Sequence, residues 1–371
     1  MNVALTGSDG FLSWHIRCFA KTMHGVNLTL LNREILADSK KSLSLLRDVD
    51  IIIHTAGVNR GDSEKHIYYG NLKCASQLAD AIGKLNRKIT VVNCNSTYVD
   101  KTSAYSRSKR EASRFLEGVC TQSNSRFIDF LLPNLFGENG RPFYNSVVAT
   151  YCYQLANGGK IEVFEDRQIE LIHAQDISKK MFAAVSGDMS GQIEISGYKI
   201  MVANLAKILT EIASNYEIGI VPDLKDKLTR DLFNTYLSFI PTARRVRKQT
   251  EQVDERGALF ETIRVEGGYF QSFVSKTAAG KTRGNHFHYT KFERFFVLQG
   301  EAVIRLRRLF SDSVAEFRIK GSDTSFIDMP TMWAHSIENV GKEELITSFY
   351  AEPLFDPDNS DTFPEEVLIR K

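Results

Sequence analysis

Cysteine is scarce in this chain, and its distribution argues against two kinds of protein. Only five cysteines occur among 371 residues, and no two of them have the C-x-x-C spacing of a metal or redox motif. The odd count and the spacing argue against a disulfide framework and against a thiolate zinc site, and they favour a reducing compartment. The five, all within the first 152 positions, are Cys18, Cys74, Cys94, Cys120 and Cys152.

Long apolar runs and an excess of charge of either sign are also missing. No uninterrupted apolar run reaches the ~18 residues expected of a membrane span, and the first residues show no secretion signal. The 47 basic and 45 acidic side chains leave a net charge of +2. This balance gives no electrostatic reason to expect a nucleic-acid or membrane partner, although a local basic patch would suffice for a small anionic substrate. We therefore expect a cytoplasmic protein.

The length of the chain predicts two domains, because a single core rarely grows this large. In residues 1–243, apolar strands alternate with helical segments, which indicates a Rossmann-like, doubly wound parallel sheet. Residues 244–255 are basic and poor in apolar side chains, so we expect a solvated linker there. Residues 256–371 change to short alternating strands separated by turns, which indicates an all-β sandwich or barrel.

A glycine-rich turn lies between the first expected strand and the first expected helix. In this setting Gly7 permits a tight turn and Gly10 permits close backbone approach. The helix that begins near Phe11 and Leu12 offers N–H groups and a positive dipole to a pyrophosphate. The third small position of such a turn, where Gly is usual, is Ser13, which still lets helix and strand pack closely. The turn therefore predicts dinucleotide binding.

The residues that follow the next two strands bear on the choice of cofactor. After the second strand there is no acidic residue to bind a ribose 2′-hydroxyl; Asn32 and Arg33 stand there instead. Arg33 would suit the 2′-phosphate of NADPH, and the alternative is that it is a solvated surface residue. After the third strand, Ala56 and Gly57 form a small-residue turn that lets the backbone lie against a cofactor.

Tyr105 and Lys109 are four residues apart, so on a helix they lie on one face. A phenol titrates near ~10, and a nearby ammonium lowers that pKa, which suits a general acid at a carbonyl that is being reduced. Taken alone, the pair also fits a solvated helix face. An expected strand ends shortly before it at Ser96, whose hydroxyl would donate to the substrate carbonyl. Thr97 is the alternative donor, and an ordinary Ser/Thr turn is the other interpretation.

In this order, the turn, the strand-end hydroxyl and the Tyr–Lys pair resemble the extended short-chain dehydrogenase/reductase family. The resemblance implies NAD(P) binding, nucleotide-sugar substrates in many members, and acid/base and cofactor-orienting roles for Tyr105 and Lys109. Leu132–Gly137 looks like the segment of that family that enters the substrate lobe, where Asn134 would line the nucleotide-sugar site. Arg141 follows as a candidate diphosphate partner, although a surface arginine would look the same in the sequence.

The C-terminal part contains the most specific pattern of the chain, three histidines and a glutamate on expected strands. His286 and His288 are separated by one residue, so they point to the same side of a strand, and Glu293 follows five residues later. His335 comes from another strand. Three imidazoles and one carboxylate suit Zn, Fe, Mn, Ni or Co. This spacing resembles the two-part signature of the cupin fold, whose other positions are matched by Gly280, Gly300, Gly321, Pro330 and Asn339.

One position departs from that signature. Met332 stands where a Gly is usual after Pro330, so this loop is expected to pack differently, with no effect on His335. Two alternatives to a metal site are open: the four residues belong to a structural core, or the fold keeps the pocket without the metal.

A reductase domain fused to a C-terminal cupin domain is uncommon. The whole chain resembles the bifunctional capsular-polysaccharide enzymes that make UDP-2-acetamido-2,6-dideoxy-β-L-talose, a precursor of N-acetyl-L-fucosamine. The resemblance implies that the cupin epimerises C3 of a UDP-4-keto-6-deoxy-HexNAc and that the reductase domain then reduces C4 with NADPH. It also implies bound zinc and a homodimer. The segments that carry it are Ala56–Arg60, Pro133–Ser146, Gly284–His288, Ser336–Asn339 and Phe355–Pro357.

Epimerisation at C3 needs a stabilised enolate, with a base on one face of the sugar and an acid on the other. The sequence does not identify these two groups. Two other function classes are open: a single-activity UDP-sugar reductase whose cupin only binds metal and dimerises, and a non-catalytic sugar-nucleotide-binding or scaffold protein. The intact Tyr–Lys pair disfavours the last. Candidates for the epimerisation acid and base are Tyr269, Tyr289, Lys291 and Glu338.

Overall fold

The computed structural model describes residues 1–99, 101–248, 252–254, 257–259, 264–265, 271–353 and 359–369. Tyr269, Phe355–Pro357 and part of the expected linker lie outside these residues. The chain divides into two compact units, Met1–Thr150 with Glu165–Val202, and Tyr151–Phe164 with Ala203–Lys371. The domain limits expected at 243 and 256 stay predictions.

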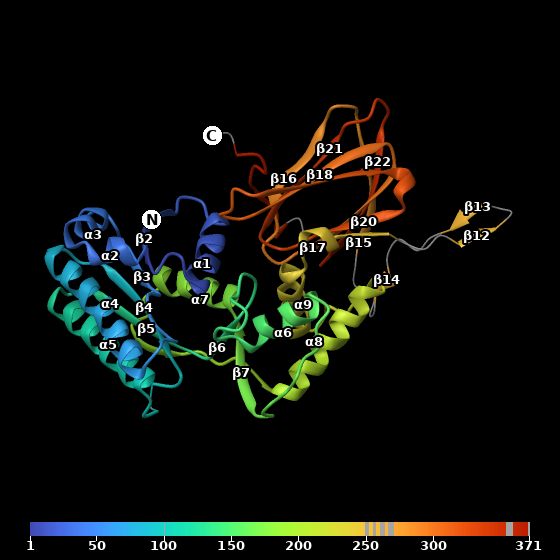
Figure 1. The fold of residues 1–371 in the computed structure, drawn as a ribbon. Coiled ribbons are helices and arrows are strands. Elements are labelled where there is room, and N and C mark those ends of the chain that lie inside the picture. The colour runs from blue at the N-terminus through green and yellow to red at the C-terminus, as the bar shows by residue number, and fades with distance from the viewer. Residues whose placement is uncertain are drawn as a thin grey trace. The chain divides into compact units, whose positions relative to one another are not determined.

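A six-stranded parallel sheet forms the centre of the first unit (Figure 1). Every neighbouring pair of strands is parallel. The chain leaves β1 for β2 on one side and then returns to β3 on the other, so the strand order reverses beside β1. Ligands of such sheets bind beyond the carboxyl ends of the strands at this reversal. In spatial order the strands are β2 (Asn27–Leu31), β1 (Asn2–Thr6), β3 (Ile51–His54), β4 (Thr90–Ser96), β5 (Arg126–Leu132) and β8 (Gly191–Glu194).

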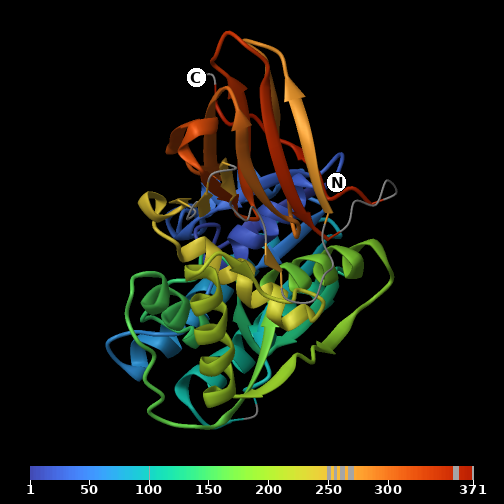
Figure 2. The same ribbon diagram turned by 90° about the vertical axis from the view of Figure 1, so that its right-hand side faces the viewer.

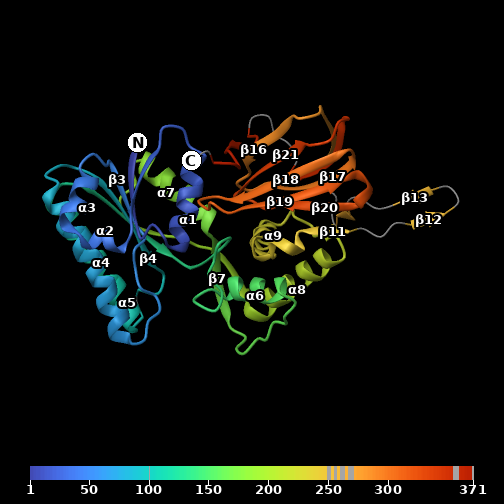
Figure 3. The same ribbon diagram turned by 45° about the horizontal axis from the view of Figure 1, so that its top comes forward.

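Helices cover both faces of this sheet. Along β1, Val3 and Leu5 belong to one apolar core and Ala4 to the other, because alternate side chains of a strand face opposite sides. Figure 3 shows α4 and α5 side by side on their face. The predicted Rossmann-like sheet is therefore confirmed. The first face carries α1 (Phe11–Lys21) and α7 (Ala174–Ser186); the second carries α2 (Arg33–Ala37), α3 (Ser39–Leu46), α4 (Glu64–Lys84) and α5 (Ala104–Gln122).

Smaller elements complete the helical part of the chain. A three-stranded sheet has the order β6 (Asn134–Phe136), β7 (Gln168–His173) and β9 (Tyr198–Met201). Further elements are α6 (Val147–Ala156), α8 (Val202–Glu217), β10 (Ile220–Val221) and α9 (Lys227–Phe239). In the described part of the chain, no helix combines the length and the apolar character that crossing a membrane requires.

Two five-stranded antiparallel sheets dominate the second unit (Figure 2). Their facing side chains share one apolar core, which includes Phe295, Ile304, Ile327 and Ile337. One sheet has the order β11 (Val246–Lys248), β20 (Ser325–Met329), β17 (Phe292–Gln299), β22 (Leu345–Glu352) and β15 (Gln271–Thr277). The other has the order β19 (Val314–Lys320), β18 (Glu301–Arg308), β21 (Trp333–Asn339), β16 (Thr282–Phe287) and β23 (Phe363–Pro364).

The sheet-rich character predicted for the C-terminal part is confirmed. A closed barrel is not, because no strand pairing joins the two sheets among the described residues. Strand β11 falls within the segment expected to be a linker, yet it pairs with β20. Two shorter pairings are β12 (Gln252–Asp254) with β13 (Gly257–Leu259), and β10 with β14 (Arg264–Val265).

A buried arginine fixes the segment that follows β23. Arg307 of β18 donates to the carbonyls of Val367 and Glu366 at 3.0 and 2.7 Å, and to the Glu365 carboxylate at 2.7 Å. Its side chain is 2% exposed, so these acceptors replace the water that the guanidinium lost on folding. One charged side chain thus holds three consecutive residues against the second sheet.

Candidate active site and metal-ligand cluster

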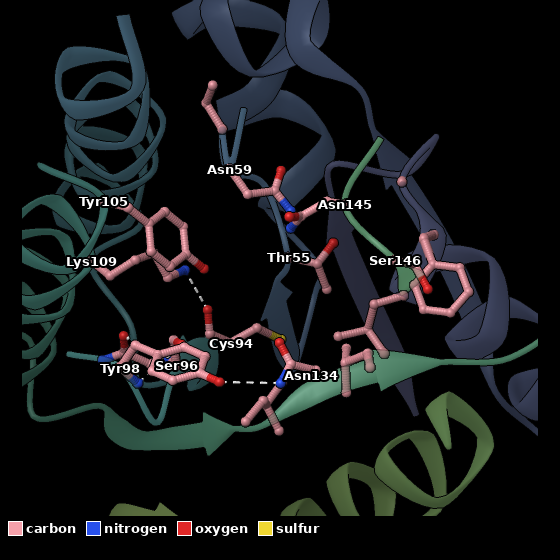
Figure 4. Close-up of a pocket in the computed structure, with 18 of the residues that line it drawn as sticks. Thr55, Asn59, Cys94, Ser96, Tyr98, Tyr105, Lys109, Asn134, Asn145 and Ser146 are labelled. Carbon is pink, nitrogen blue, oxygen red and sulfur yellow. Dashed lines mark hydrogen bonds between the residues drawn. The ribbon is translucent and has the colours of Figure 1, made fainter. Parts of the chain in front are cut away.

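A cleft of about 520 Å³ opens at the carboxyl ends of β1, β3, β4 and β5, where the strand order reverses. Figure 4 shows side chains from these strand ends directed into it. The structure therefore brings many of the expected cofactor, catalytic and substrate residues of the first domain to one place, but Gly7, Asn32, Arg33 and Ala56 are not among the lining residues. Those that line the cleft are Gly10, Phe11, Leu12, Gly57, Ser96, Tyr105, Lys109, Asn134 and Arg141.

The glycine-rich turn forms a tight cradle at one side of the cleft. Gly7 has a φ of +64°, and a Cβ atom there would lie 2.8 Å from the backbone of Ala56, so a side chain would displace the loop after β3. Ser13 donates to the Gly7 carbonyl at 2.7 Å and lies 2.5 Å from the Thr55 hydroxyl. The serine at the third small position thus ties the turn to the neighbouring loop. Since the N-terminus of α1 borders the cleft, the cradle fits a pyrophosphate.

The two residues expected to select NADPH differ in what their side chains do. Asn32 caps α2, because its side-chain oxygen accepts a hydrogen bond from the Ile35 N–H at 2.9 Å. Arg33 is the first residue of α2 and is exposed. Of the two, Arg33 is therefore the better placed to meet a phosphate group.

A buried asparagine that no sequence pattern indicated shapes the loop after β3. Asn71 of α4 accepts from the Val58 N–H at 2.8 Å and donates to the Val58 carbonyl at 2.7 Å. Its amide also donates to the Ser108 hydroxyl of α5 at 3.1 Å. A Cβ atom at Gly57 would lie 2.9 Å from the Asn71 side-chain oxygen, so the glycine gives the amide room to reach the loop. The small-residue turn is thus held from behind by two helices.

Tyr105 and Lys109 lie one turn apart at the start of α5 (Figure 4). Ser103 begins this helix by accepting a hydrogen bond from the Ser106 N–H at 3.1 Å, which fixes where the pair enters the cleft. Lys109 is buried, and its ammonium donates to the Cys94 carbonyl of β4. The spacing seen in the sequence therefore does place both side chains on the cleft side of one helix.

The protonation of this pair differs from the expectation. Burial raises the pKa of the Tyr105 phenol, and a hydrogen bond with Ser96 only partly offsets this. The expected lowering of the Tyr105 pKa is therefore wrong, because burial disfavours the phenolate more than its neighbours favour it. Burial likewise lowers the pKa of Lys109, with Cys94 and Asp129 acting in the opposite direction.

Of the two candidate hydroxyls at the end of β4, Ser96 lines the cleft together with Tyr105 and acts to lower the pKa of its phenol. Its oxygen also accepts a hydrogen bond from the Tyr98 N–H at 3.2 Å, which fixes its direction. Thr97 donates instead to the Leu132 carbonyl at 3.5 Å. The geometry thus favours Ser96 over Thr97 as the group beside the phenol.

Asn134 and Arg141 occupy the opposite part of the cleft. Asn134 donates to the Tyr98 hydroxyl at 3.2 Å and to the Glu170 carbonyl at 3.1 Å (Figure 4). Arg141 is exposed and lies over the Tyr144 ring, with 4.9 Å between the guanidinium carbon and the ring centroid. Tyr98, which no sequence motif indicated, therefore belongs to the cleft wall.

A second arginine joins two loops that line the cleft. Arg60 donates through one guanidinium nitrogen to the carbonyls of Phe143, at 2.9 Å, and Tyr144. It thereby links the loop after β3, which carries Val58 and Asn59, to the loop after β6. The partners are 83 and 84 residues apart in the chain, so no local sequence pattern could have indicated the contact.

His54, at the end of β3, makes the stability of the protein depend on pH. Its Nδ1 lies 2.7 Å from the Thr6 hydroxyl, and burial, with the Lys109 ammonium, lowers its pKa to about 3. The folded protein keeps this imidazole neutral, whereas the unfolded chain takes up a proton below about pH 6.5. The contribution to stability is fully present above that pH and falls by about 1.4 kcal/mol per pH unit as the pH drops toward about 3.

We therefore expect His54→Asn to reduce the acid sensitivity. The free energy of unfolding, measured by urea titration, should differ between about pH 7 and about pH 5 by roughly 2 kcal/mol less than in the wild type. His24→Asn, at an exposed position, should leave that difference unchanged. If His54→Asn also left it unchanged, a group other than His54 would be taking up the protons.

Three histidines and one glutamate meet in the second unit. One ligand atom from each of His286, His288, Glu293 and His335 can be chosen so that all four lie within 4.8 Å of one another. The Nε2 atoms of His288 and His335 lie 3.1 and 3.3 Å from the same Glu293 oxygen. Strands of both sheets contribute, because β16 and β21 supply histidines and β17 supplies the glutamate.

The surroundings of the imidazoles fit a metal ion. Nδ1 of His288 lies 2.7 Å from the Asp361 carbonyl, and Nδ1 of His335 lies 3.3 Å from the Trp333 carbonyl. Each ring therefore keeps its proton on Nδ1 and turns the Nε2 lone pair inward. Both Nε2 atoms are buried and lack a hydrogen bond among the described residues. Burial also lowers the pKa of His286 to about 3, which leaves it in the neutral form that binds metals.

A β-bulge places His286 opposite His335. The register between β16 and β21 pairs Gly284 with Ser336 and then shifts by one residue, so that His286 faces His335. Gly284 has a φ of +99°, and a Cβ atom there would lie 2.7 Å from the His335 carbonyl oxygen. Only glycine, therefore, lets the two strands approach this closely beside the ligands.

Gly284→Ala should cost more stability than Gly280→Ala and should also weaken metal binding. Both glycines have positive φ, 99° and 72°, but a Cβ atom at Gly280 meets nothing within 4 Å. We expect about 1–2 kcal/mol for Gly280→Ala from the backbone alone, and roughly 2 kcal/mol more for Gly284→Ala, where β21 must move as well. Urea unfolding and metal content by elemental analysis check this. Equal costs with equal metal content would contradict the role given to the bulge.

The candidates for the epimerisation acid and base lie at different distances from the cluster. The Lys291 ammonium is 3.6 Å from a Glu293 oxygen, so it borders the cluster directly. Glu338 pairs with Arg305 at 2.6 Å, on the face of β21 opposite to His335, so its position does not support it as a candidate. Tyr289 is buried two residues before Lys291.

Met332 adopts a backbone conformation that favours glycine. Its φ is +60° and its side chain is fully buried. A left-handed conformation costs a residue other than glycine about 1–2 kcal/mol. The Met332 N–H donates to the His288 carbonyl at 2.8 Å, which ties this strained turn to the ligand segment. The turn thus keeps the shape that a glycine would take.

Comparison with known proteins finds a different family model for each part of the chain. Residues 16–195 match the model of the NAD dependent epimerase/dehydratase family, and residues 252–363 match that of the polysaccharide biosynthesis C-terminal domain. The first range contains most of the parallel sheet and the cleft, and the second contains the metal-ligand cluster.

The similarity to two individual proteins extends over nearly the whole chain. The UDP-2-acetamido-2,6-beta-L-arabino-hexul-4-ose reductase of Pseudomonas aeruginosa is 28% identical over 368 residues, which cover 98% of each chain. The crystal structure of the capsular polysaccharide assembling protein CapF from Staphylococcus aureus is 28% identical, with a TM-score of 0.66, and covers 99% of this chain and 100% of that one.

A third similarity concerns the fold alone. The UDP-N-acetylglucosamine 4-epimerase of Methanobrevibacter ruminantium is 19% identical, with a TM-score of 0.55, over 64% of this chain and 98% of its own. Together with the sheet topology, these matches show a Rossmann-type, epimerase-like fold in the N-terminal part of the chain and a C-terminal part that is similar to the polysaccharide biosynthesis C-terminal domain.

Proposed function

We propose that the N-terminal domain is an NADPH-dependent reductase that acts on the C4 ketone of a UDP-4-keto-6-deoxy-HexNAc. The observation that carries the proposal is the position of Tyr105, whose phenol lines the cleft beside Ser96, with Lys109 one helical turn away. The Pseudomonas aeruginosa relative, named as a reductase of a hexul-4-ose, supports this substrate class.

In this proposal the three side chains divide the work of carbonyl reduction. Tyr105 donates its proton to the C4 oxygen, and burial keeps the phenol protonated until then. Ser96 donates a hydrogen bond that orients the same oxygen. Lys109 holds the cofactor ribose, and its charge stabilises the phenolate left on Tyr105. NADPH supplies the hydride when bound.

The cofactor is proposed to lie along the turn Gly7–Leu12 and the turn Ala56–Gly57. Gly7 packs against the Ala56 backbone without room for a side chain, and the N-terminus of α1 that follows this turn suits a pyrophosphate. Arg33 stands at the start of α2, beyond the end of β2, and would meet a 2′-phosphate. NADPH should therefore be preferred to NADH.

The UDP-sugar is proposed to occupy the part of the cleft lined by Asn134 and Arg141. A guanidinium suits a diphosphate because it presents several donors to the phosphate oxygens. The proposed product is UDP-2-acetamido-2,6-dideoxy-L-talose, for N-acetyl-L-fucosamine in a capsule or O-antigen. The capsular polysaccharide assembling protein from Staphylococcus aureus supports this pathway class.

We also propose that His286, His288, Glu293 and His335 hold a divalent metal ion, with Zn²⁺ as the first choice for these ligands. A bound ion would supply Lewis acidity at a carbonyl oxygen. The proposed activity of this domain is epimerisation at C3 of the same ketosugar, where the C–H bond lies next to the ketone. The alternative is a single-activity reductase whose C-terminal domain binds the metal and forms a homodimer.

One reaction in deuterated water tests these proposals together. Protein, NADPH and the UDP-4-keto-6-deoxy-HexNAc should consume NADPH and yield the talose product with deuterium at C3. NADPH consumption without deuterium at C3 would leave only the single-activity reductase. No consumption of NADPH with this ketosugar would overturn the proposed function. Light scattering of the purified protein tests the homodimer separately.

A further inference from the structure

A buried carboxylate lies behind the catalytic helix and takes no part in the proposed reaction. Asp129 of β5 is 4% exposed. One of its oxygens accepts a hydrogen bond from the Asn93 amide at 2.7 Å, and the other accepts from the Asn95 amide and the Ser113 hydroxyl, both at 2.8 Å. All three donors are neutral, so the network carries the charge of one carboxylate.

This network touches the catalytic groups from two directions. Ser113 lies one turn after Lys109 on the same face of α5, so its bond to Asp129 places the carboxylate one helical turn from the ammonium. Asn95 accepts a hydrogen bond from the Ser96 N–H at 2.9 Å. Asp129 is thus connected by hydrogen bonds both to the helix of Tyr105 and to the strand end of Ser96.

The other groups that face Lys109 bring no negative charge. Cys94 on β4 and Cys74 on α4 are thiols whose pKa burial raises, the former to about 12. His54 on β3 is neutral because burial lowers its pKa to about 3. Tyr105 stays protonated for the same reason of burial. Among the described residues that act electrostatically on Lys109, only Asp129 has a carboxyl group.

We propose that Asp129 is the counter-charge that keeps the Lys109 ammonium protonated inside the protein and so sets the upper pH limit of carbonyl reduction. The inference rests on the proposed reductase function. An ammonium taken out of water loses its proton unless an opposite charge compensates the lost hydration. Asp129 therefore helps to position Tyr105 and Lys109 and keeps the positive charge on Lys109, without touching substrate or cofactor.

Asp129→Asn tests the charge with little change of shape. An opposite charge at this range shifts a titration by about 1–3 pH units, so the alkaline limb of kcat/KM against pH should move down by at least about one unit. On the alkaline side of the wild-type limb, where activity falls tenfold per pH unit, the rate should therefore fall about tenfold or more. Ser113→Ala removes one hydrogen bond of the same network but no charge, and its alkaline limb should stay where the wild-type limb is. A limb unmoved in Asp129→Asn would overturn the proposal.

A double variant distinguishes charge from packing. Asn93 and Asp129 are paired across β4 and β5 and are joined by one hydrogen bond. The double variant Asn93→Asp/Asp129→Asn exchanges the two side chains, so the carboxylate moves from position 129 to position 93. Asn93 does not line the cleft. If the charge matters, the double variant should regain most of the alkaline activity that Asp129→Asn lost. Failure to regain it, in a protein that folds and binds NADPH, would indicate a structural role instead.

A measurement without substrate separates this proposal from the proposed function. The side-chain NMR signal of Lys109, assigned by its loss in Lys109→Met, should titrate at lower pH in Asp129→Asn than in the wild type. That shift in a protein that reduces no ketosugar would support the counter-charge and overturn only the reductase. Reduction by the wild type with no shift of the Lys109 titration would overturn the counter-charge and leave the reductase intact.

Discussion

Tyr105→Phe is expected to lower kcat for NADPH-dependent ketosugar reduction by about 10²–10⁴-fold, the range usual for loss of a general acid. The phenol is the proton donor that lines the cleft, and Ser96 beside it can orient the carbonyl but is too weak an acid to replace it. The affinity for NADPH, measured by fluorescence titration, should change little because Lys109 and the glycine turn remain. The rate is measured from the consumption of NADPH.

Tyr68→Phe is the matched control for this experiment. It removes a phenol hydroxyl from the same domain, one that donates to Glu111 at 2.6 Å and does not line the cleft. Its kcat should stay within about twofold of the wild-type value. Equal rates for Tyr105→Phe and wild type would remove the phenol from the mechanism, whatever else the cleft binds.

Among substitutions in the C-terminal domain, loss of one metal ligand is expected to have the largest effect on metal binding and on thermal stability. His288→Ala should abolish stoichiometric metal binding, because only three of the four candidate ligands would remain around the ion. A metal present at about a thousand times its dissociation constant stabilises the folded state by about 4 kcal/mol. A chelator should therefore lower the melting temperature of the wild type, and it should have no further effect on His288→Ala.

Glu338→Gln serves as the control for the metal experiment. This carboxylate lies on β21, as His335 does, but on the other face, where it pairs with Arg305. The variant should keep the metal content of the wild type. A wild-type protein that takes up neither zinc nor another divalent ion, with a melting temperature insensitive to chelator, would exclude the proposed metal centre.

Spacing along single elements was enough to predict much of the site. Tyr105 and Lys109 share a helical face because they are four residues apart, and His286 shares a strand face with His288 because they are two apart. The turn at Gly7 was recognisable because strand, glycines and helix follow one another directly. In each case the physical cause lies within a few residues of chain.

Contacts between distant segments could not be predicted in this way. Asp129 meets its asparagine partners across two strands whose pairing depends on the whole sheet. Asn93 and Asn95 did carry a signal, since two amides on one face of a buried strand require a polar partner. Arg60 carried none. The pKa of Tyr105 was misjudged because burial, which no local sequence pattern reports, raises it more than Ser96 lowers it.

The bulge beside Gly284 shows another limit of sequence periodicity. Alternation along a strand places His286 and His288 on one side, but it says nothing about the residue opposite them. That pairing depends on a one-residue register shift between β16 and β21, which brings His335 across from His286. The glycine was visible in the sequence, whereas the shift that it permits was not.

The anchoring of the last described segment by Arg307 has a practical consequence for handling the protein. Proteolysis or truncation after Pro364 would remove the three acceptors that residues 365–367 supply. The buried Arg307 guanidinium, which water barely reaches, would then lose most of its hydrogen-bond partners. Affinity tags are therefore better attached beyond Val367, with a spacer. Versions of the protein that end before Glu365 are therefore expected to express as insoluble material.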